Sequence, residues 1–160
     1  MTGERPGRTA PWAKALGAVL LALVVTLVVS WVVAGARESA REHTAFENTR
    51  DDARRFADAL IARGGPLSRQ DVENTLDQAT GKGRGDGLLY KVSSVDGRTR
   101  AVVQFARVYQ RSVHLFGPAE ATADRCFTVD LPPSAATRDN VRILAHGADE
   151  SCTQVAAGVG

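Results

Sequence analysis

The chain has 160 residues, 44% of them hydrophobic, and a formal net charge of +2. This length suits one modest domain with an appendage. From Arg37 onward, basic and acidic residues are equal in number, seventeen of each. This part therefore lacks the net positive field that non-specific nucleic-acid binding requires, and we expect no nucleic-acid partner.

The N-terminal region reads as a short tail followed by a membrane span. Residues 1–14 hold three basic side chains, with several Gly and Pro, and predict a disordered cytoplasmic tail. Residues 15–36 contain no charge, and as a helix they would be about 33 Å long, enough to cross a hydrocarbon core. Trp12 and Trp31 are spaced by about 28 Å on such a helix, which suits the two membrane interfaces. The sequence therefore predicts a transmembrane helix at 15–36 and the lipid bilayer as a partner.

A cleaved signal peptide is the alternative for this region. Ala34, Gly35 and Ala36 fit the small-x-small pattern that precedes a cleavage site. The apolar run is, however, longer than the 7 to 15 residues of a usual signal core, which favours a retained anchor. No Cys follows the run closely, so a lipoprotein is excluded. If residues 1–36 are removed, the protein is secreted.

The two cysteines decide the expected orientation, because basic residues flank the apolar run on both sides. Cys126 and Cys152 are the only cysteines, and an even count after an export signal predicts a disulfide. Closing a loop of this size stabilises a small domain by roughly 3 kcal/mol on the chain-entropy model. We therefore expect residues 64–160 to form a small extracytoplasmic α+β domain on a single-pass cell-membrane protein.

Residues 37–63 predict a helix that continues from the membrane. Its apolar positions make a narrow stripe at spacings of seven, three and four. The stripe either packs on the chain's own sheet or pairs with a second copy or another envelope protein. An ion pair is expected between Asp51 and Arg55, and Gly64 and Gly65 before Pro66 end the helix. The stripe consists of Phe46, Ala53, Phe56 and Leu60.

A short second helix is predicted after this Gly-Gly-Pro stop. Ser68 is placed to cap it, with Asp71 three residues later in a capping-box arrangement. Leu67 and Val72 occupy the positions of a hydrophobic staple. Gly81 ends the segment, whose apolar face comprises Val72, Leu76 and Ala79.

The sheet is predicted from a hairpin at Asp96-Gly97, a pair that favours a type I′ turn. Counting outward from a two-residue loop places six apolar side chains on one face. Further strands are expected at residues 113–116, 126–131 and 141–145, with the disulfide joining 126–131 to a C-terminal segment at 152–155. The expected hairpin pairs are Val92 with Ala101, Tyr90 with Val103, and Leu88 with Phe105.

A search for chemistry yields no catalytic constellation and no cofactor site. The glycine-rich residues 81–87 hold Lys82 and Arg84, which together with backbone amides form a hypothetical anion-binding loop. Arg84-Gly85-Asp86 is also an adhesion tripeptide, although a flexible linker explains the stretch best. The histidines (His43, His114, His146) have no metal-ligand spacing, the serines (Ser112, Ser134, Ser151) lie in no nucleophile motif, and Asp149-Glu150 lacks a calcium-loop pattern.

We therefore expect a non-enzymatic, membrane-anchored domain that acts in binding or assembly at the cell envelope. The alternative is a sensory or ligand-binding module that uses the sheet face as a pocket, with Tyr90, Phe105 and Tyr109 partly exposed. A hydrolase-type enzyme would require a His and a carboxylate to meet in a cleft.

Overall fold

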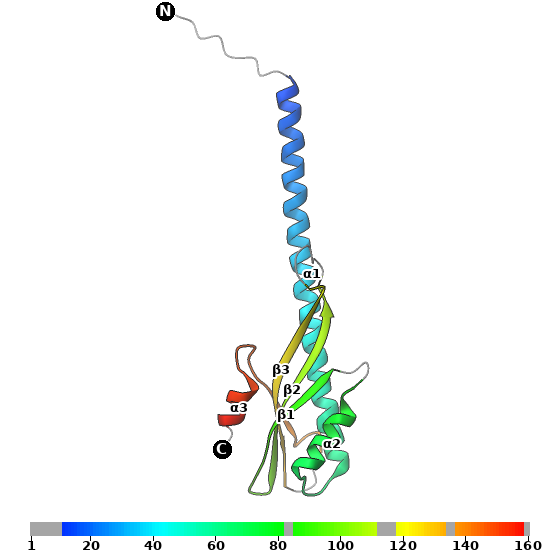
Figure 1. The fold of residues 1–160 in the computed structure, drawn as a ribbon, viewed down its shortest axis with the longest axis vertical. Helices are drawn as coiled ribbons and strands as arrows, with labels where there is room; N and C mark the ends of the chain where they lie inside the picture. The colour runs from blue at the N-terminus through cyan, green and yellow to red at the C-terminus, as the bar shows by residue number, and fades with distance from the viewer. Residues whose placement is uncertain (1–10, 82–84, 112–117, 134–136, 159–160) are drawn as a thin grey trace, which may run out of the picture.

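The computed structural model describes residues 11–81, 85–111, 118–133 and 137–158. These residues form an α+β fold, as the sequence predicts, with one apolar N-terminal helix, two shorter helices and a four-stranded antiparallel sheet (Figure 1). The elements in chain order are α1 (Pro11–Arg63), α2 (Arg69–Ala79), β1 (Asp86–Val95), β2 (Arg98–Gln110), β3 (Glu120–Leu131), β4 (Arg142–Ala145) and α3 (Cys152–Gly158).

Helix α1 is a single helix of 53 residues that joins the predicted segments 15–36 and 37–63 without a break. It begins four residues earlier than predicted, at Pro11, whose fixed φ suits a first helical turn. Residues 11–14 of the expected disordered tail are therefore helical, and residues 1–10 lie outside the described residues. The helix ends at Arg63 as predicted, because Gly64 (φ 65°) and Gly65 (φ 75°) adopt left-handed conformations.

The N-terminal half of α1 is long and apolar enough to cross a membrane. Its most apolar stretch has a mean hydropathy of 2.7, and none of that stretch is buried in the protein. The C-terminal half instead packs against the sheet, so one helix connects an exposed apolar segment to the folded part of the chain (Figure 1). We call residues 37–158 the head.

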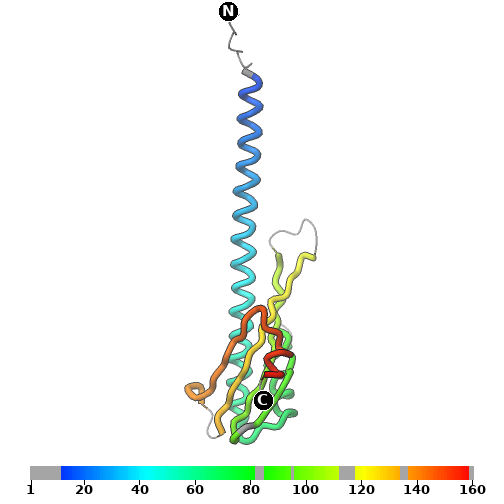
Figure 2. The backbone as a smooth tube through the Cα atoms, turned by 90° about the vertical axis from the view of Figure 1, so that its left-hand side faces the viewer, coloured from blue at the N-terminus to red at the C-terminus, as the bar shows by residue number. Residues whose placement is uncertain are grey.

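The head has three layers, with the sheet in the middle. The strands follow the order β1-β2-β3-β4, α1 and α2 cover one face, and α3 lies on the other (Figures 1 and 2). Alternating residues of the central strands point to opposite faces. The inner-face residues from β2 and β3 are Ala101, Val103, Phe105, Phe127, Val129 and Leu131.

The core is organised by three aromatic rings from α1, β2 and β3. Phe105 makes edge-to-face contacts with Phe56 at 6.0 Å and with Phe127 at 5.9 Å between ring centroids. Ala53, Phe56 and Leu60 of the predicted stripe are buried here. The structure therefore bears out packing on the chain's own sheet, and these three side chains are not available to a second copy or another protein.

The predicted turn at the β1–β2 hairpin is confirmed. Asp96 (φ 53°) and Gly97 (φ 73°) both have positive φ, as a type I′ turn requires. The two-residue loop sets the register, and Val92 pairs with Ala101 as predicted.

Beyond that pair the predicted register is wrong, because a β-bulge at Tyr90 adds one residue to β1. Leu89, not Tyr90, pairs with Val103, and Leu88 does not pair with Phe105. Leu89 consequently packs against the main core, whereas Tyr90 belongs to the opposite face, beside the disulfide.

The remaining strands differ from the predictions mainly in length. The segment predicted at 126–131 is the second half of β3, which starts six residues earlier, at Glu120. The segment predicted at 141–145 is β4, and the C-terminal segment at 152–155 belongs to helix α3. The strand predicted at 113–116 lies outside the described residues.

A buried ion pair joins α1 to β2. The carboxylate of Asp52, 1% exposed, accepts hydrogen bonds from Nε and Nη2 of Arg107, both at 2.7 Å. Arg55 also donates to Asp52. The predicted pair between Asp51 and Arg55 is therefore wrong, since Asp51 binds Arg54 at 2.9 Å instead. Each arginine pairs with the aspartate three residues before it, so Arg55 contacts the buried carboxylate of Asp52 and not that of Asp51.

The capping box of α2 is confirmed. Ser68 Oγ accepts from the Asp71 backbone N–H at 3.2 Å, and the Ser68 N–H donates to the Asp71 carboxylate at 3.1 Å. Arg63, at the end of α1, contacts the same carboxylate at 3.0 Å. The hydrogen bonds from the Ser68 side chain and backbone, with the charge of Arg63, hold the pKa of Asp71 below its ordinary value of 3.8.

Because the folded-state pKa is lowered, the Asp71 carboxylate stabilises the head above pH 3.8, and this contribution disappears as the pH falls through the folded-state pKa. We expect Asp71→Asn to be less stable than the wild type at neutral pH and equally stable at sufficiently acidic pH. Urea unfolding of both proteins across this range measures the difference. A difference that is independent of pH would contradict the assignment.

Candidate ligand site beside the disulfide

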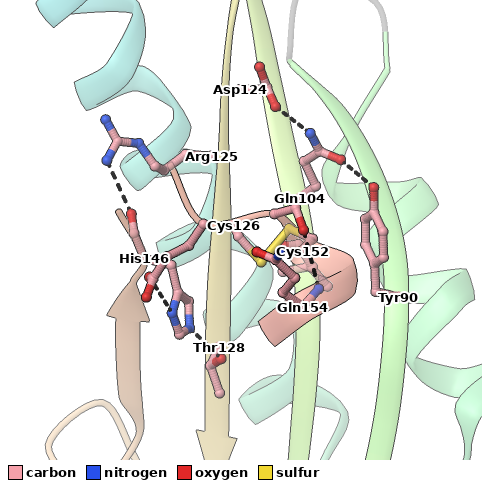
Figure 3. The surroundings of a disulfide bond; sticks show 12 residues. Tyr90, Gln104, Asp124, Arg125, Cys126, Thr128, His146, Cys152 and Gln154 are labelled. Atoms are coloured by element: carbon pink, nitrogen blue, oxygen red, sulfur yellow. Dashed lines mark hydrogen bonds and ion pairs between the residues drawn. A yellow bond between two sulfur atoms is a disulfide. The ribbon is translucent and has the colours of Figure 1, made fainter. Parts of the chain in front are cut away.

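The predicted disulfide between Cys126 and Cys152 is present, with a Cα–Cα distance of 5.3 Å. Cys126 lies on β3, and Cys152 is the first residue of α3. Both are buried against Val102 on the outer face of the sheet, the face opposite α1 and α2 (Figure 3). Lys91 donates from Nζ to the carbonyl of Ala156 at 3.0 Å, which adds a second tie between α3 and the sheet.

A row of polar side chains crosses three strands beside this disulfide (Figure 3). Tyr90 donates its hydroxyl hydrogen to Gln104 Oε1 at 2.7 Å, and Gln104 Nε2 donates to the Asp124 carboxylate at 2.5 Å. The bulge in β1 accounts for the row, because it places Tyr90 on the outer face beside Gln104.

A cavity of about 270 Å³ lies between this polar row and residues 147–153, which comprise the loop before α3 and the start of that helix. Hydroxyl, amide and carboxylate groups converge on it from the strands, and Glu150 lines it from the loop. Such a set of groups suits a small polar ligand that both donates and accepts hydrogen bonds. This is the candidate ligand site.

His146 holds the loop beside this site against β3. Its Nε2 shares a hydrogen bond with Thr128 Oγ1 at 2.8 Å, and its Nδ1 lies 3.3 Å from the Glu150 carboxylate. Glu150 also accepts from the Gly147 backbone N–H at 2.9 Å. That backbone hydrogen bond, followed by the contacts with His146, lowers the pKa of Glu150 below its ordinary value of 4.5.

Thr128, His146 and Glu150 contact one another in the sequence hydroxyl, imidazole, carboxylate, which is also the arrangement of a catalytic triad. Thr128 is, however, only 6% exposed, so a substrate carbonyl has no approach to its Oγ1 in this conformation. The three residues therefore brace the loop on β3.

Arg125 connects the same loop to α1. Its guanidinium lies 3.6 Å from the ring centroid of Phe46, in a cation–π contact, and Nη1 donates to the His146 carbonyl at 3.1 Å. Phe46, the first member of the predicted stripe along the chain, is thus half-buried beneath an arginine.

The other residues singled out in the sequence are dispersed. Trp12 and Trp31 are exposed on α1. Asp86 of the adhesion tripeptide begins β1. Outside the described residues lie Lys82, Arg84, His114, Ser112 and Ser134.

The sensory alternative expects three aromatic side chains to be partly exposed on the sheet face. Tyr90 and Tyr109 are partly exposed, whereas Phe105 is fully buried beneath α1. Within residues 11–81, 85–111, 118–133 and 137–158, no group of three or more His, Cys, Asp or Glu side chains is placed to hold a metal ion. Asp149 and Glu150 thus have no third ligand of that kind there.

No family model, curated protein or solved structure matches the chain.

Sequence reasoning missed the polar row and the buried pair of Arg107 with Asp52. The sequence did contain a signal for the buried pair. Arg107 is an even number of residues from Val103 and Phe105 in the same strand, so it points to the same, inner face of the sheet. A charge at an inward position requires a buried partner. The polar row had no such signal, because it depends on the bulge.

The disulfide is expected to stabilise the head. Replacing both residues, Cys126→Ala with Cys152→Ala, is expected to lower the free energy of unfolding by roughly 3 kcal/mol, because the loop between them is no longer closed in the unfolded chain. Urea unfolding of the full chain in detergent, with and without reductant, measures the loss. The reductant should destabilise the wild type and leave the double variant unchanged. Two reactive thiols in the native protein would contradict the assignment.

Proposed function

We propose that the protein is a single-pass membrane protein whose head lies outside the cytoplasm and acts, without catalysis, in binding or assembly at the cell envelope. The observation that carries the proposal is the continuity of α1, which is exposed and apolar in its first half and part of the head's core in its second. A helix that belongs to both parts fixes the head's height and direction relative to the bilayer. This suits a protein that presents a surface to a neighbour.

The outer sheet face supports the binding role. By strand alternation Leu88, Val108 and Leu144 point to this face, and all three are exposed, whereas α3 covers the region around the disulfide. Apolar side chains beside a polar cavity are common in interaction surfaces. The disulfide supports an oxidising compartment for the head.

Fractionation of cells that express the full chain tests the anchor. We expect the protein in the membrane fraction, released by detergent but not by alkaline carbonate, with its N-terminus upstream of residue 15. A soluble protein that starts at Arg37 would instead support a secreted protein with a cleaved signal peptide.

Photo-crosslinking in intact cells tests the binding role. A photoreactive residue at Leu88 or Val108 is expected to yield a discrete adduct with one envelope protein or a second copy. The matched control is Glu73, on the solvent side of α2 and away from the outer face. Absence of adducts from both outer-face positions, or equal adducts from Glu73, would count against an interaction surface there.

A ligand-binding module is the second candidate, favoured by the cavity beside the disulfide. Asp124→Asn preserves the shape of the row and removes one charge from the cavity. If the head binds a small cationic or hydrogen-bond-donating ligand there, thermal stabilisation by that ligand should be lost in the variant.

A further inference from the structure

Strands β2 and β3 extend beyond the rest of the sheet as a two-stranded ribbon. β1 accompanies β2 only to the pair of Asp86 with Ala106, so residues 107–110 and 120–123 pair with each other alone. In both views the ribbon reaches farther toward the N-terminal half of α1 than the other strands do (Figures 1 and 2). This two-stranded ribbon, which we call the arm, therefore extends from the head along α1 toward the apolar segment of that helix.

The arm is fixed to α1 just after the charge-free run ends. Arg41 donates from Nη1 to the carbonyl of Gln110, the last residue of β2, at 3.0 Å. Ala34 and Glu38, one helical turn apart, are half-buried, although the positions on either side of each are exposed. One face of α1 is therefore shielded from residue 34 onward.

A cleft of about 690 Å³ lies between the helix and the arm. From α1 it is lined by Trp31, the small residues 34–36 and Glu38, and from the arm by Tyr109 and Arg111. Trp31 is 80% exposed and lies within the row of large exposed apolar residues that extends back to Trp12. The cleft is thus continuous with the apolar surface of the helix.

The position of the cleft along α1 coincides with the change from apolar to charged sequence. Trp31 is the last large aromatic residue of the apolar run, and Arg37 is the first charge after it. From Trp31 to Glu38 the helix rises about 10 Å. The headgroup layer of a bilayer adds about 5 to 8 Å beyond each side of the hydrocarbon core. A span that ends near Trp31 therefore places Tyr109 and Arg111 at headgroup depth.

We infer that the end of the β2–β3 arm is a second membrane contact, and that the cleft holds the headgroup of a zwitterionic phospholipid of the outer leaflet. This inference rests on the proposed membrane anchor.

The lining fits that ligand. The guanidinium of Arg111 matches a phosphate, with which arginine forms paired hydrogen bonds, and the negative charge of Glu38 on the opposite wall favours the ammonium end of the headgroup on that side. Tyr109 and Trp31 are aromatic residues with a polar edge, which favour the membrane interface. The pairing of one cation with one anion favours a zwitterionic over an anionic headgroup.

Fluorescence of the full chain in phosphatidylcholine vesicles tests the inference. The chain has two tryptophans, so Trp12→Phe with Trp31→Phe gives a dark background. Into this background we would introduce Tyr109→Trp as the reporter. The matched control is Leu88→Trp, at a side chain that is 57% exposed and lies on the outer sheet face. The control is paired with Gln104, five residues from Tyr109 and therefore about 17 Å away along the strand.

Vesicles with bromine near the headgroup end of the acyl chain should quench the reporter about as strongly as they quench Trp31 in the single-tryptophan variant Trp12→Phe, and they should leave the control unquenched. Aqueous iodide should show the opposite order. Adding Arg111→Glu to the reporter protein should reduce the bromine quenching, and Arg111→Lys should retain it.

The other outcomes overturn the inference in distinguishable ways. Quenching of Trp31 in the Trp12→Phe variant without quenching of the Tyr109→Trp reporter leaves the anchor intact and rejects the second contact. A reporter protected from both bromine and iodide is covered by protein, for example a second copy, and also rejects it. Failure of bromine to quench the native tryptophans rejects the proposed anchor itself.

Discussion

Replacement of Asp52 by Asn is expected to lower the free energy of unfolding of the head by about 3 kcal/mol, because it leaves the Arg107 guanidinium without its buried counter-charge. Arg107 is 20% exposed, which places the loss at the lower end of the range for broken buried pairs. Urea unfolding of the full chain in detergent, followed by near-ultraviolet circular dichroism, measures the effect.

Two further variants isolate the pair. Asp51→Asn removes a carboxylate from the same helical turn but breaks only an exposed pair, so its cost should stay below about 1 kcal/mol. Arg107→Gln combined with Asp52→Asn should cost clearly less than the sum of the two single changes. Strict additivity would show that Asp52 and Arg107 contribute independently and would contradict the ion pair.

The second large effect is expected at Phe105, the central ring of the three that join α1, β2 and β3. Phe105→Ala removes contacts with both neighbouring rings and leaves a cavity, so we expect a loss of about 4 kcal/mol. The same unfolding measurement applies. The expected loss approaches the whole stability of a small domain.

Leu88→Ala is the control for this change, because Leu88 pairs with β2 close to Phe105 but is exposed. Its effect should stay within about 0.5 kcal/mol. Similar losses for Phe105→Ala and Leu88→Ala would place the core on the wrong face of the sheet.

The local structure was predictable where a residue type has one strong conformational preference. Asp96-Gly97 defined the hairpin turn, Ser68 with Asp71 defined the start of α2, and the glycines after Arg63 defined the end of α1. Each of these signals acts over a few residues, so no tertiary information was necessary.

The register beyond the bulge was not predictable in the same way. Leu88, Leu89 and Tyr90 are three consecutive apolar residues, so alternation does not say which of them faces the core. The structure resolves this by packing Leu89 inside and by satisfying the Tyr90 hydroxyl with Gln104. A hydroxyl that is partly removed from water needs a partner, and the partner of Tyr90 became visible only in three dimensions.

Pairs distant in sequence account for the remaining differences. Asp52 and Arg107 are separated by 55 positions, and their contact depends on how α1 lies across β2. The candidate ligand site combines residues of three strands and the loop before α3. Spacing within any single segment carries no trace of such a site, whereas the disulfide was predictable because the chain has only two cysteines.

A protease added to intact cells that express the full chain tests most directly whether the head lies outside the cytoplasm. We predict loss of the head, with a membrane-embedded fragment that contains residues 15–36 left behind, at a protease concentration that spares a cytoplasmic marker. A full-length chain that resists the protease until the cells are lysed, together with free thiols at Cys126 and Cys152, would contradict an extracytoplasmic, disulfide-bonded head.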